Sequence, residues 1–445
     1  MKSDGDATQA RNLRTGLPVW LAHRVRDAPD HRPIHGLTVD VAVIGGGVSG
    51  ALVADAMLQA GQTVAVFDRR GLSKGSTPAS TALLQFEIDK PLMILGDKIG
   101  HASAARAYWR SAAAIDQLRG RIDDLGLRCG FRERHTAYLP GNVLNLAGLR
   151  REAEARVRIG LRSRFVDRDE LRRQTNVDKP GAIWSSGSAE VDPVRLVRGL
   201  WRSVIARGGS VYTPVEIVDI DPGRSAVSLS TDGGAVIRAK SVVLATGYEL
   251  AKMLHPKGYK VISTWVMATV PQKRNLWPSR CLIWEAADPY LYIRTTVDNR
   301  VVVGGEDQDF SDDAHRDRLI PGKIKRIQAK LKKLIPQLDT EADFAWAGCF
   351  GDSVTGLPAI GQVPGAKGCY AVMGFGGNGI TFSVIAAQML QRTVLGLPDP
   401  DSEKITINLG YVDLGHIDLM VQDSFYANRT DFIRKRCSAA LGFLP

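Results

Sequence analysis

A short glycine-rich stretch near the N-terminus constrains the fold of this chain more than any other feature. The apolar residues 41–44 run directly into Gly-Gly-Gly-Val-Ser-Gly at 45–50. Four apolar residues before a glycine are typical of a buried parallel strand, and the Ala- and Leu-rich residues 48–60, closed by Gly61, are typical of a helix. A second apolar run at 63–67 follows. The stretch predicts a strand–turn–helix–strand unit.

The spaced glycines of this turn have separate physical roles. Gly45 permits the tight turn, Gly47 lets the backbone approach a pyrophosphate, and Gly50 lets the helix pack closely on the sheet. Asp68 follows Gly50 by 68 − 50 = 18 residues. A carboxylate that bonds a ribose hydroxyl is expected about 20 residues on. The pattern predicts a dinucleotide site, with a turn that binds nothing as the alternative.

A second glycine-rich turn lies near the end of the chain. Residues 370–373 are predicted to form a strand, residues 374–381 (Gly-Phe-Gly-Gly-Asn-Gly-Ile-Thr) a turn, and residues 382–395 a helix. The N–H groups at this helix start can hold another negative centre of the ligand.

Two further segments are expected near the ligand. Residues 75–81 are too rich in Ser, Thr, Gly and Pro for a helix interior and predict a loop whose hydroxyls reach ligand oxygens; a solvated turn is the alternative. Residues 241–247 form an apolar run ending in glycine, which predicts another strand of the first sheet.

The middle of the chain predicts a second sheet. Residues 265–270, 290–295 and 301–304 alternate as antiparallel strands do. Residues 321–335 predict a basic amphipathic helix, which either lies on an anionic membrane or presents a solvated face over a core stripe. The narrow apolar face, without Trp or Phe, favours the second alternative.

The composition is that of a globular protein with more than one core. The chain has 445 residues, 44% of them hydrophobic, and a net charge of +11 carried by scattered arginines. Without a nucleic-acid-binding motif, this charge does not predict a nucleic-acid partner. The five cysteines are odd in number and include no C-x-x-C pair, so neither disulfides nor a zinc site is expected. Without an apolar leader or a membrane-length run, we expect a cytoplasmic protein.

Four segments together resemble the D-amino acid oxidase-type family of FAD-dependent oxidoreductases, which includes glycine and sarcosine oxidases. They are Gly45 to Asp68, Gly75 to Gln85, Ser241 to Gly247, and Trp346 to Thr381. The resemblance implies an α/β fold, with a Rossmann-type FAD-binding domain and a discontinuous α+β substrate domain built on an antiparallel sheet. It also implies that a C–N bond is oxidised: hydride passes to flavin N5, the imine is hydrolysed, and oxygen or another acceptor reoxidises the flavin.

The resemblance divides the chain into discontinuous domains. The predicted segments are an N-terminal arm at 1–36, the FAD-binding domain at 37–95, 190–250 and 345–397, the substrate domain at 96–189 and 251–344, and a tail of unknown role at 398–445.

The predicted cofactor-binding residues lie on the two glycine turns, the hydroxyl-rich loop and neighbouring strand ends. They are Gly45, Gly47, Val48, Ser49, Gly50, Asp68, Arg69, Ser76, Thr77, Ser80, Thr81, Val215, Ala245, Thr246, Gly247, Gly374, Gly376, Gly377, Asn378, Gly379, Ile380 and Thr381. No metal is expected. Cys349 lies one residue beyond the flavin-linking cysteine of sarcosine oxidases, and such a slip turns a strand side chain to the opposite face. We therefore expect non-covalent FAD.

The chain departs from the family where a substrate carboxylate is usually held. Phe350 replaces the arginine of W-A-G-x-R, Thr355 replaces an acid before Gly-Leu-Pro, and Gly377 stands where glycine oxidases carry a second arginine. Arg294 shares a strand face with Tyr290 and Tyr292 and is either a substitute anion binder or a structural arginine.

These departures favour an amine as the substrate. The predicted catalytic residues are Tyr290, Tyr292, Arg294 and Phe350. One alternative is oxidation of a D-amino acid or N-methyl amino acid with Arg294 as the clamp, and another is a non-catalytic FAD-binding protein. The expected partners are the small-molecule substrate and an electron acceptor, without nucleic acid; peripheral membrane contact is the less favoured option.

Overall fold

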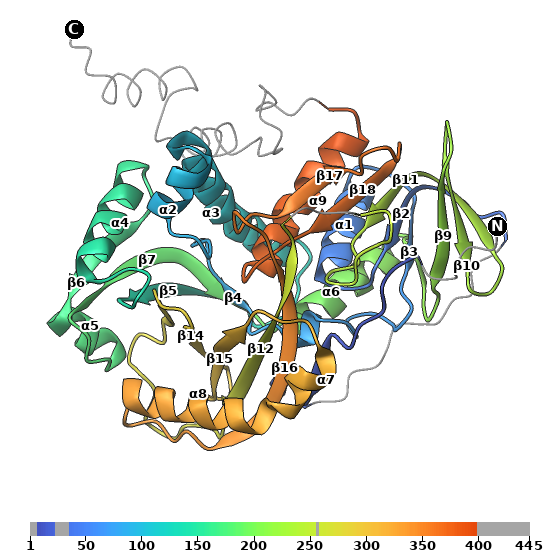
Figure 1. The fold of residues 1–445 in the computed structure, drawn as a ribbon. Coiled ribbons are helices and arrows are strands. Elements are labelled where there is room, and N and C mark those ends of the chain that lie inside the picture. Colours follow the sequence, from blue (N-terminus) through green and yellow to red (C-terminus); the bar gives the residue numbers. More distant parts are fainter. Residues whose placement is uncertain (1–6, 23–34, 255–257, 398–445) are drawn as a thin grey trace, which may run out of the picture.

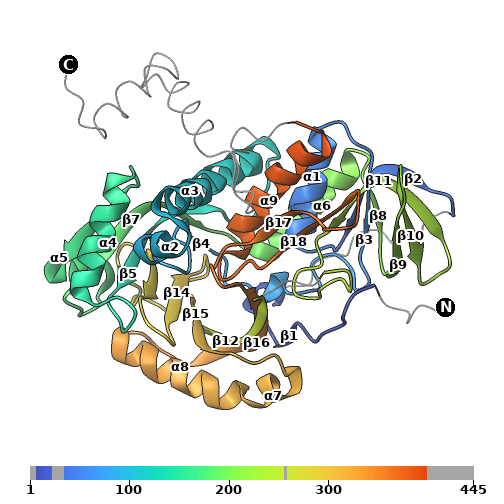
Figure 2. The ribbon, with the colours of Figure 1, turned by 45° about the horizontal axis from the view of Figure 1, so that its top comes forward.

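The computed structural model describes residues 7–22, 35–254 and 258–397. Their strands form an eight-stranded and a ten-stranded sheet, called here the first and the second sheet. In Figures 1 and 2, α1, α6 and α9 lie with the first sheet, and α8 runs beneath the second sheet. The C-terminal tail predicted at 398–445 lies outside the described residues.

The first sheet contains the predicted strand–turn–helix–strand unit. Its strands, in spatial order, are β17 (Ala359–Gln362), β18 (Cys369–Met373), β11 (Val236–Leu244), β2 (Thr38–Ile44), β3 (Val64–Phe67) and β8 (Ser210–Tyr212), with β9 (Ile217–Pro222) and β10 (Val227–Thr231) attached through β11. β18, β11, β2, β3 and β8 pair in parallel, whereas β17 pairs antiparallel with β18. The carboxyl ends of β2, β3 and β11 therefore meet at one edge, where ligands bind in open α/β sheets.

The second sheet is built almost entirely from antiparallel pairs. Its order is β1 (Arg14–Gly16), β16 (Ala342–Asp352), β12 (Lys260–Thr269), β15 (Val301–Gln308), β14 (Leu291–Thr295), β13 (Leu282–Glu285), β5 (Arg132–Leu139), β7 (Gly181–Glu190) and β4 (Leu83–Leu84), with β6 (Ser163–Asp167) paired to β7. The exception is the parallel pair of β13 and β5. The predicted antiparallel second sheet is confirmed.

Helices cover both sheets. They are α1 (Val48–Gln59), α2 (Leu92–Ile99), α3 (His101–Asp124), α4 (Leu146–Arg158), α5 (Arg168–Thr175), α6 (Pro193–Ala206), α7 (Asp313–Arg318), α8 (Ile320–Leu334) and α9 (Gly379–Val394), with short 3₁₀ turns at Val19–Leu21 and Thr77–Ala79. Helix α6 begins at a capping aspartate: Asp192 accepts hydrogen bonds from Val194 N at 3.0 Å and Arg195 N at 2.9 Å.

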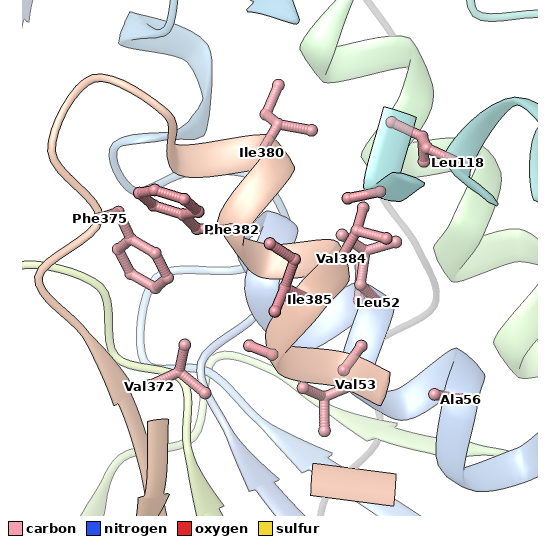
Figure 3. Close-up of a cluster of buried hydrophobic side chains, with 14 of the residues drawn as sticks. Leu52, Val53, Ala56, Leu118, Val372, Phe375, Ile380, Phe382, Val384 and Ile385 are labelled. Carbon is pink, nitrogen blue, oxygen red and sulfur yellow. The ribbon is translucent and has the colours of Figure 1, made fainter. Parts of the chain in front are cut away.

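The two helices that follow the glycine turns pack against each other. Leu52 and Val53 of α1 lie among Val384 and Ile385 of α9, and Leu118 of α3 joins them (Figure 3). A buried hydrogen bond of 2.8 Å joins Ser49 Oγ and Ser383 Oγ within this contact. The helix starts of both glycine turns are thus held side by side.

Helix α8 has the predicted amphipathic form. Ile324, Ile327 and Leu331 are buried in the core of the second sheet, as the core-stripe alternative requires. Among the described residues, no helix has the length and apolar character needed to cross a bilayer.

The domain boundaries stay a prediction, but three strands pair differently from the segments proposed for them. β16 joins the second sheet, although the segment from 345 was assigned to the FAD-binding domain, and β1 of the N-terminal arm pairs with β16. β4, assigned to 37–95, pairs with β7. The sequence of a strand shows which of its side chains alternate between the two faces, but not which other strand it pairs with. These pairings are therefore set by the tertiary structure.

The packing of α1 on β2 makes Gly50 indispensable. A Cβ built at Gly50 would lie 1.9 Å from Gly45 O, which is a backbone atom that cannot move aside. We predict that Gly50→Ala lowers the free energy of unfolding by about 3 kcal/mol and abolishes flavin retention. Thermal unfolding and the flavin absorbance of purified protein measure both effects.

The matched control is Gly120→Ala in α3, where an added Cβ meets nothing within 4 Å. An alanine there should leave flavin content unchanged and raise stability by about 0.5–1 kcal/mol. Equal stability and flavin content in the two variants would contradict the close-packing role of Gly50.

Candidate functional site

A cavity lies at the carboxyl edge of the first sheet. It brings together both glycine turns, the hydroxyl-rich loop and the strand ends chosen from the sequence. The predicted residues that line it are Gly45, Gly47, Val48, Ser49, Asp68, Arg69, Ser76, Thr77, Val215, Ala245, Thr246, Gly247 and Gly379. Gly50 does not line it, because its role is the close contact of α1 with β2.

The start of α1 suits a phosphate. The N-cap residue of α1, Gly47, has no side chain with which to cap the helix, and a Cβ there would meet Thr77 Oγ1 at 3.3 Å. Val48 N donates to Thr77 Oγ1 at 3.1 Å, so the hydroxyl-rich loop lies directly against the turn. Uncapped helix N–H groups with their positive dipole are an anion site, and the residues present therefore fit a dinucleotide pyrophosphate.

The Asp68 carboxylate also accepts hydrogen bonds from backbone N–H groups of the turns around the cavity. Its Oδ2 accepts from Gly46 N at 2.6 Å, and its Oδ1 accepts from Arg70 N and Gly71 N at 2.8 Å each. A carboxylate has about four acceptor positions, so a ribose hydroxyl can still bond to it.

Sequence reasoning missed an ion-pair cluster at the rim of this cavity. Arg69 Nη1 lies 2.7 Å from Glu216 Oε1, and Arg69 Nη2 lies 2.8 Å from Glu249 Oε2. Arg70 also pairs with Glu249, which accepts a further hydrogen bond from Arg11 N at 2.7 Å. Arg69 was among the predicted residues, but its partners Glu216 and Glu249 come from separate parts of the chain and no motif marks them.

A second cavity continues from the first. The two share Val48, Ser76, Thr77, Tyr248 and Gly379. The predicted residues found only in the second are Ser80, Thr81, Tyr290, Tyr292, Phe350, Gly376, Gly377, Asn378 and Ile380. One continuous hollow therefore runs from the first glycine turn to the face of the second sheet.

The second glycine turn is fastened to the loop that precedes α2. Asn378 Nδ2 donates to Gln85 O at 3.1 Å and to Glu87 O at 2.9 Å, and Thr381 Oγ1 donates to Gln85 O at 3.3 Å. Thr381 and Gly374 line neither cavity. Thr381 supports the turn instead of facing the hollow.

Arg294 does not lie in the cavity, and the structure argues against it as a carboxylate clamp. Its Nη1 donates to Ala82 O and Val191 O at 2.8 Å each and to Thr81 O at 3.2 Å. Its Nη2 lies 3.8 Å from Glu190 Oε2. Only 2% of the residue is exposed. Alternation correctly placed Arg294 on the face of the two tyrosines but could not show that the loop at 80–82 covers it.

The second cavity is lined by carboxylates and by no cationic side chain among the described residues. Sequence reasoning missed both acids, Glu87 and Asp89. Glu87 is buried and lies 3.5 Å from Arg156 Nη1. Asp89 accepts from Gly377 N at 2.7 Å, and burial raises its pKa to about 6. Asp89 is therefore the negative group of the cavity without a cationic neighbour in bonding range.

Cys349 lines the second cavity as a thiol. Its Sγ lies 3.7 Å from Leu13 O, and burial raises the pKa of the thiol to about 11. The described cysteines, Cys129, Cys281, Cys349 and Cys369, are all free and buried. Within the described ranges no group of three or more His, Cys, Asp or Glu residues could hold a metal ion.

Comparison with known proteins agrees with this geometry. Residues 40–393 match the family model described as FAD dependent oxidoreductase. The chain is 25% identical over 371 residues to gamma-glutamylputrescine oxidoreductase of Escherichia coli, covering 81% of this chain and 84% of that protein. It is 25% identical over 379 residues to glycine oxidase of Bacillus licheniformis, covering 81% and 94%.

Solved structures share the fold. The crystal structure of glycine oxidase from Geobacillus kaustophilus matches with a TM-score of 0.67 and 22% identity, covering 84% of this chain and 97% of that one. The predicted Rossmann-type domain with a substrate domain is thereby confirmed. Separately, residues 400–442 match the Ribbon-Helix-Helix transcriptional regulator family, in a segment outside the described residues.

The contacts of Arg294 predict a structural effect of its removal. Arg294→Ala removes the guanidinium that donates to the carbonyls of Thr81, Ala82, Val191 and Thr295, so we expect the free energy of unfolding to fall by about 3 kcal/mol. Thermal unfolding measures this. The control is Arg195→Ala. Arg195 is exposed and its ion pair with Asp192 spans 3.4 Å, so its removal should lower the free energy of unfolding by less than about 0.5 kcal/mol. An Arg294→Ala protein of unchanged stability would contradict the structural role.

The state of Cys349 predicts a non-covalent flavin. Because a protonated thiol is a poor nucleophile, acid precipitation of the protein should release all FAD into the supernatant. The Cys349→Ser variant should retain the wild-type flavin content before precipitation. Flavin that stays in the pellet of wild type but not of the variant would show a covalent link.

Proposed function

The chain belongs to the FAD-dependent oxidoreductase family, and on this premise we propose that it oxidises a C–N bond of a cationic amine without a carboxylate beside the reacting carbon. The single observation that carries the proposal is the charge of the second cavity, where carboxylates but no Arg, Lys or His line the described walls. An unpaired substrate carboxylate in such a cavity would be strongly disfavoured.

The residues at the two positions where the family pattern carries arginines support this proposal. Phe350 lines the cavity where the family pattern has an arginine. At the other position, a Cβ on Gly377 would lie 2.8 Å from Asp89 Oδ1, so an acid occupies the space beside this turn. The local charge is thus inverted relative to a carboxylate-binding site, and a positively charged amine fits it.

The residues around the hollow have distinct proposed roles. Bound FAD supplies the acceptor for the hydride equivalent lost from the amine carbon. The uncapped starts of α1 and α9 hold negative charge through their N–H groups and helix dipoles. Tyr290, Tyr292 and Phe350 would contact the apolar body of the amine and exclude water.

Asp89 is suited to proton transfer from the amine. Its carboxyl group, with a pKa of about 6, is mostly ionised at neutral pH. A carboxylate poised near neutrality can attract an ammonium group and accept one of its protons, which frees the nitrogen lone pair for oxidation.

The relatives do not decide between substrate classes by themselves. One is named for an amine, gamma-glutamylputrescine, and another for an amino acid, glycine. The D-amino acid alternative needs a clamp, and Arg294 is committed to backbone carbonyls. The predictions of an oxygen or other electron acceptor, a cytoplasmic location and no nucleic-acid partner stay predictions.

A matched pair of substrates tests the proposal. D-norvaline and its decarboxylated product, butylamine, differ only in the carboxylate. Anaerobic mixing with the holoenzyme should bleach the flavin at least about tenfold faster with butylamine, because about 1.4 kcal/mol of differential stabilisation gives that factor. Stopped-flow absorbance of the flavin measures the rates.

The control is Phe350→Arg, which restores an arginine at the family position. In this variant D-norvaline should reduce the flavin faster than in wild type, so the difference in rate between butylamine and D-norvaline should become smaller. Faster reduction by D-norvaline than by butylamine in wild type would overturn the amine proposal. Absence of bleaching with every amine and amino acid tried would favour the non-catalytic alternative.

A further inference from the structure

We propose that residues 7–16, called here the N-terminal strap, form a wall of the cofactor cavity and control how fast bound FAD leaves the protein. The match to the family model begins at residue 40, so the strap lies outside the matched segment. The inference goes beyond the proposed function, because it concerns retention of the cofactor and holds for any substrate.

Two residues of the strap line the first cavity. Thr8 and Leu13 contribute to the same cavity as the first glycine turn, and they are only 8% and 7% exposed. Leu13 also lies against the hydroxyl-rich loop, since a Cβ built at Gly75 would be 3.5 Å from Leu13 Cδ1. Gly75 itself lines the cavity. An apolar side chain of the strap is therefore buried beside residues expected to hold the ligand.

One end of the strap is bound to the loop that follows β11 of the first sheet. Thr8 forms an antiparallel bridge with Ala251, and Gln9 N donates to Leu250 O at 3.1 Å. The residues directly before this loop, 245–249, all line the cavity. This end of the strap therefore lies next to the carboxyl edge of the first sheet.

The middle of the strap is bound to the ion-pair cluster at the cavity rim. Arg11 N donates to Glu249 Oε1 at 2.7 Å, and Arg70 Nη2 donates to Arg11 O at 3.0 Å. Glu249 and Arg70 pair with each other, and both line the cavity. Hydrogen bonds to charged groups are stronger than those between neutral groups, so these contacts hold the strap firmly against the cavity wall.

The other end of the strap is bound to the second sheet and to α7. β1 pairs antiparallel with β16 at the edge of this sheet (Figure 2). Asn12 N donates to Asp313 Oδ2 at 2.9 Å, and Thr15 Oγ1 donates to Asp317 Oδ2 at 2.7 Å. The strap therefore runs from one sheet to the other along the wall of the cavity.

The strap is the part of this wall that opens most readily. It contains one edge strand of three residues, whereas the glycine turn joins the internal strand β2 to α1. Segments with few backbone partners open locally at a lower free energy than the core of a sheet. Opening of the strap removes Leu13 from the cavity and weakens FAD binding. By reciprocity, bound FAD favours the closed strap by the same factor.

The rate of FAD release from the holoenzyme tests the proposal. The rise of flavin fluorescence after dilution measures this rate. Leu13→Ala shortens the buried side chain and should release FAD at least about tenfold faster than wild type. Leu13→Met conserves the volume and should release FAD at a rate within about twofold of wild type.

A second variant loosens the strap at a residue that does not line the cavity. Thr15→Val removes the hydroxyl that donates to Asp317 and keeps the shape of the side chain, so release should become about fivefold faster. The control is Leu17→Ala. Leu17 directly follows the strap and is 51% exposed, so release should change by less than about twofold. A cooperative thermal unfolding transition shows that each variant is folded.

Hydrogen exchange of the wild-type protein tests the same coupling without any variant. The amides of residues 9–16 should exchange at least about tenfold more slowly in the holoenzyme than after removal of FAD. The internal control is α8, which lines neither cavity and should change by less than about twofold.

Two results would overturn the inference. One is FAD release within about twofold of wild type in both Leu13→Ala and Thr15→Val. The other is equal exchange of the strap amides with and without FAD. Either result would leave the proposed oxidation of an amine intact, because that proposal depends on the charge of the second cavity.

Discussion

The rest of the structure depends on the close approach of α1 to β2 at Gly50. Because no side chain separates the helix from Gly45 O, the helix start meets the carboxyl edge of the first sheet. Helix α1 also packs against α9. Leu52 and Ile385 belong to the same buried hydrophobic cluster, and a hydrogen bond joins Ser49 and Ser383. Two uncapped helix starts consequently face one hollow, which is the arrangement that a ligand with several negative centres needs.

The chemistry of the hollow is decided by which charges are neutralised within the protein. Arg294 bonds to backbone carbonyls and approaches Glu190, and the buried Glu87 approaches Arg156, so these charges are matched internally. Asp89 lines the cavity and accepts a hydrogen bond from Gly377 N, without a cation bonded to it. In a low-dielectric cavity such an imbalance discriminates strongly between a cationic and an anionic substrate.

The relation between family and substrate follows from this balance. Residues 40–393 match the family as a whole, whereas Phe350 and Gly377 stand where the resemblance to glycine oxidases implies arginines. Cofactor binding depends on backbone geometry and helix ends, which many sequences provide. Substrate choice depends on a few side chains, and changing their charge alters it without altering the fold.

The sequence alone determined the elements whose signal is local. The first glycine turn before α1 and the apolar stripe of α8 are each set by residues close together in the sequence, and the structure has them where predicted. Only the tertiary structure decided what meets across the chain: that β1 and β16 belong to the second sheet, that a loop covers Arg294, and that Asp89 lies against Gly377. Strand pairing and charge partners are long-range contacts, and no period or motif in one segment encodes the residue that will pack against it.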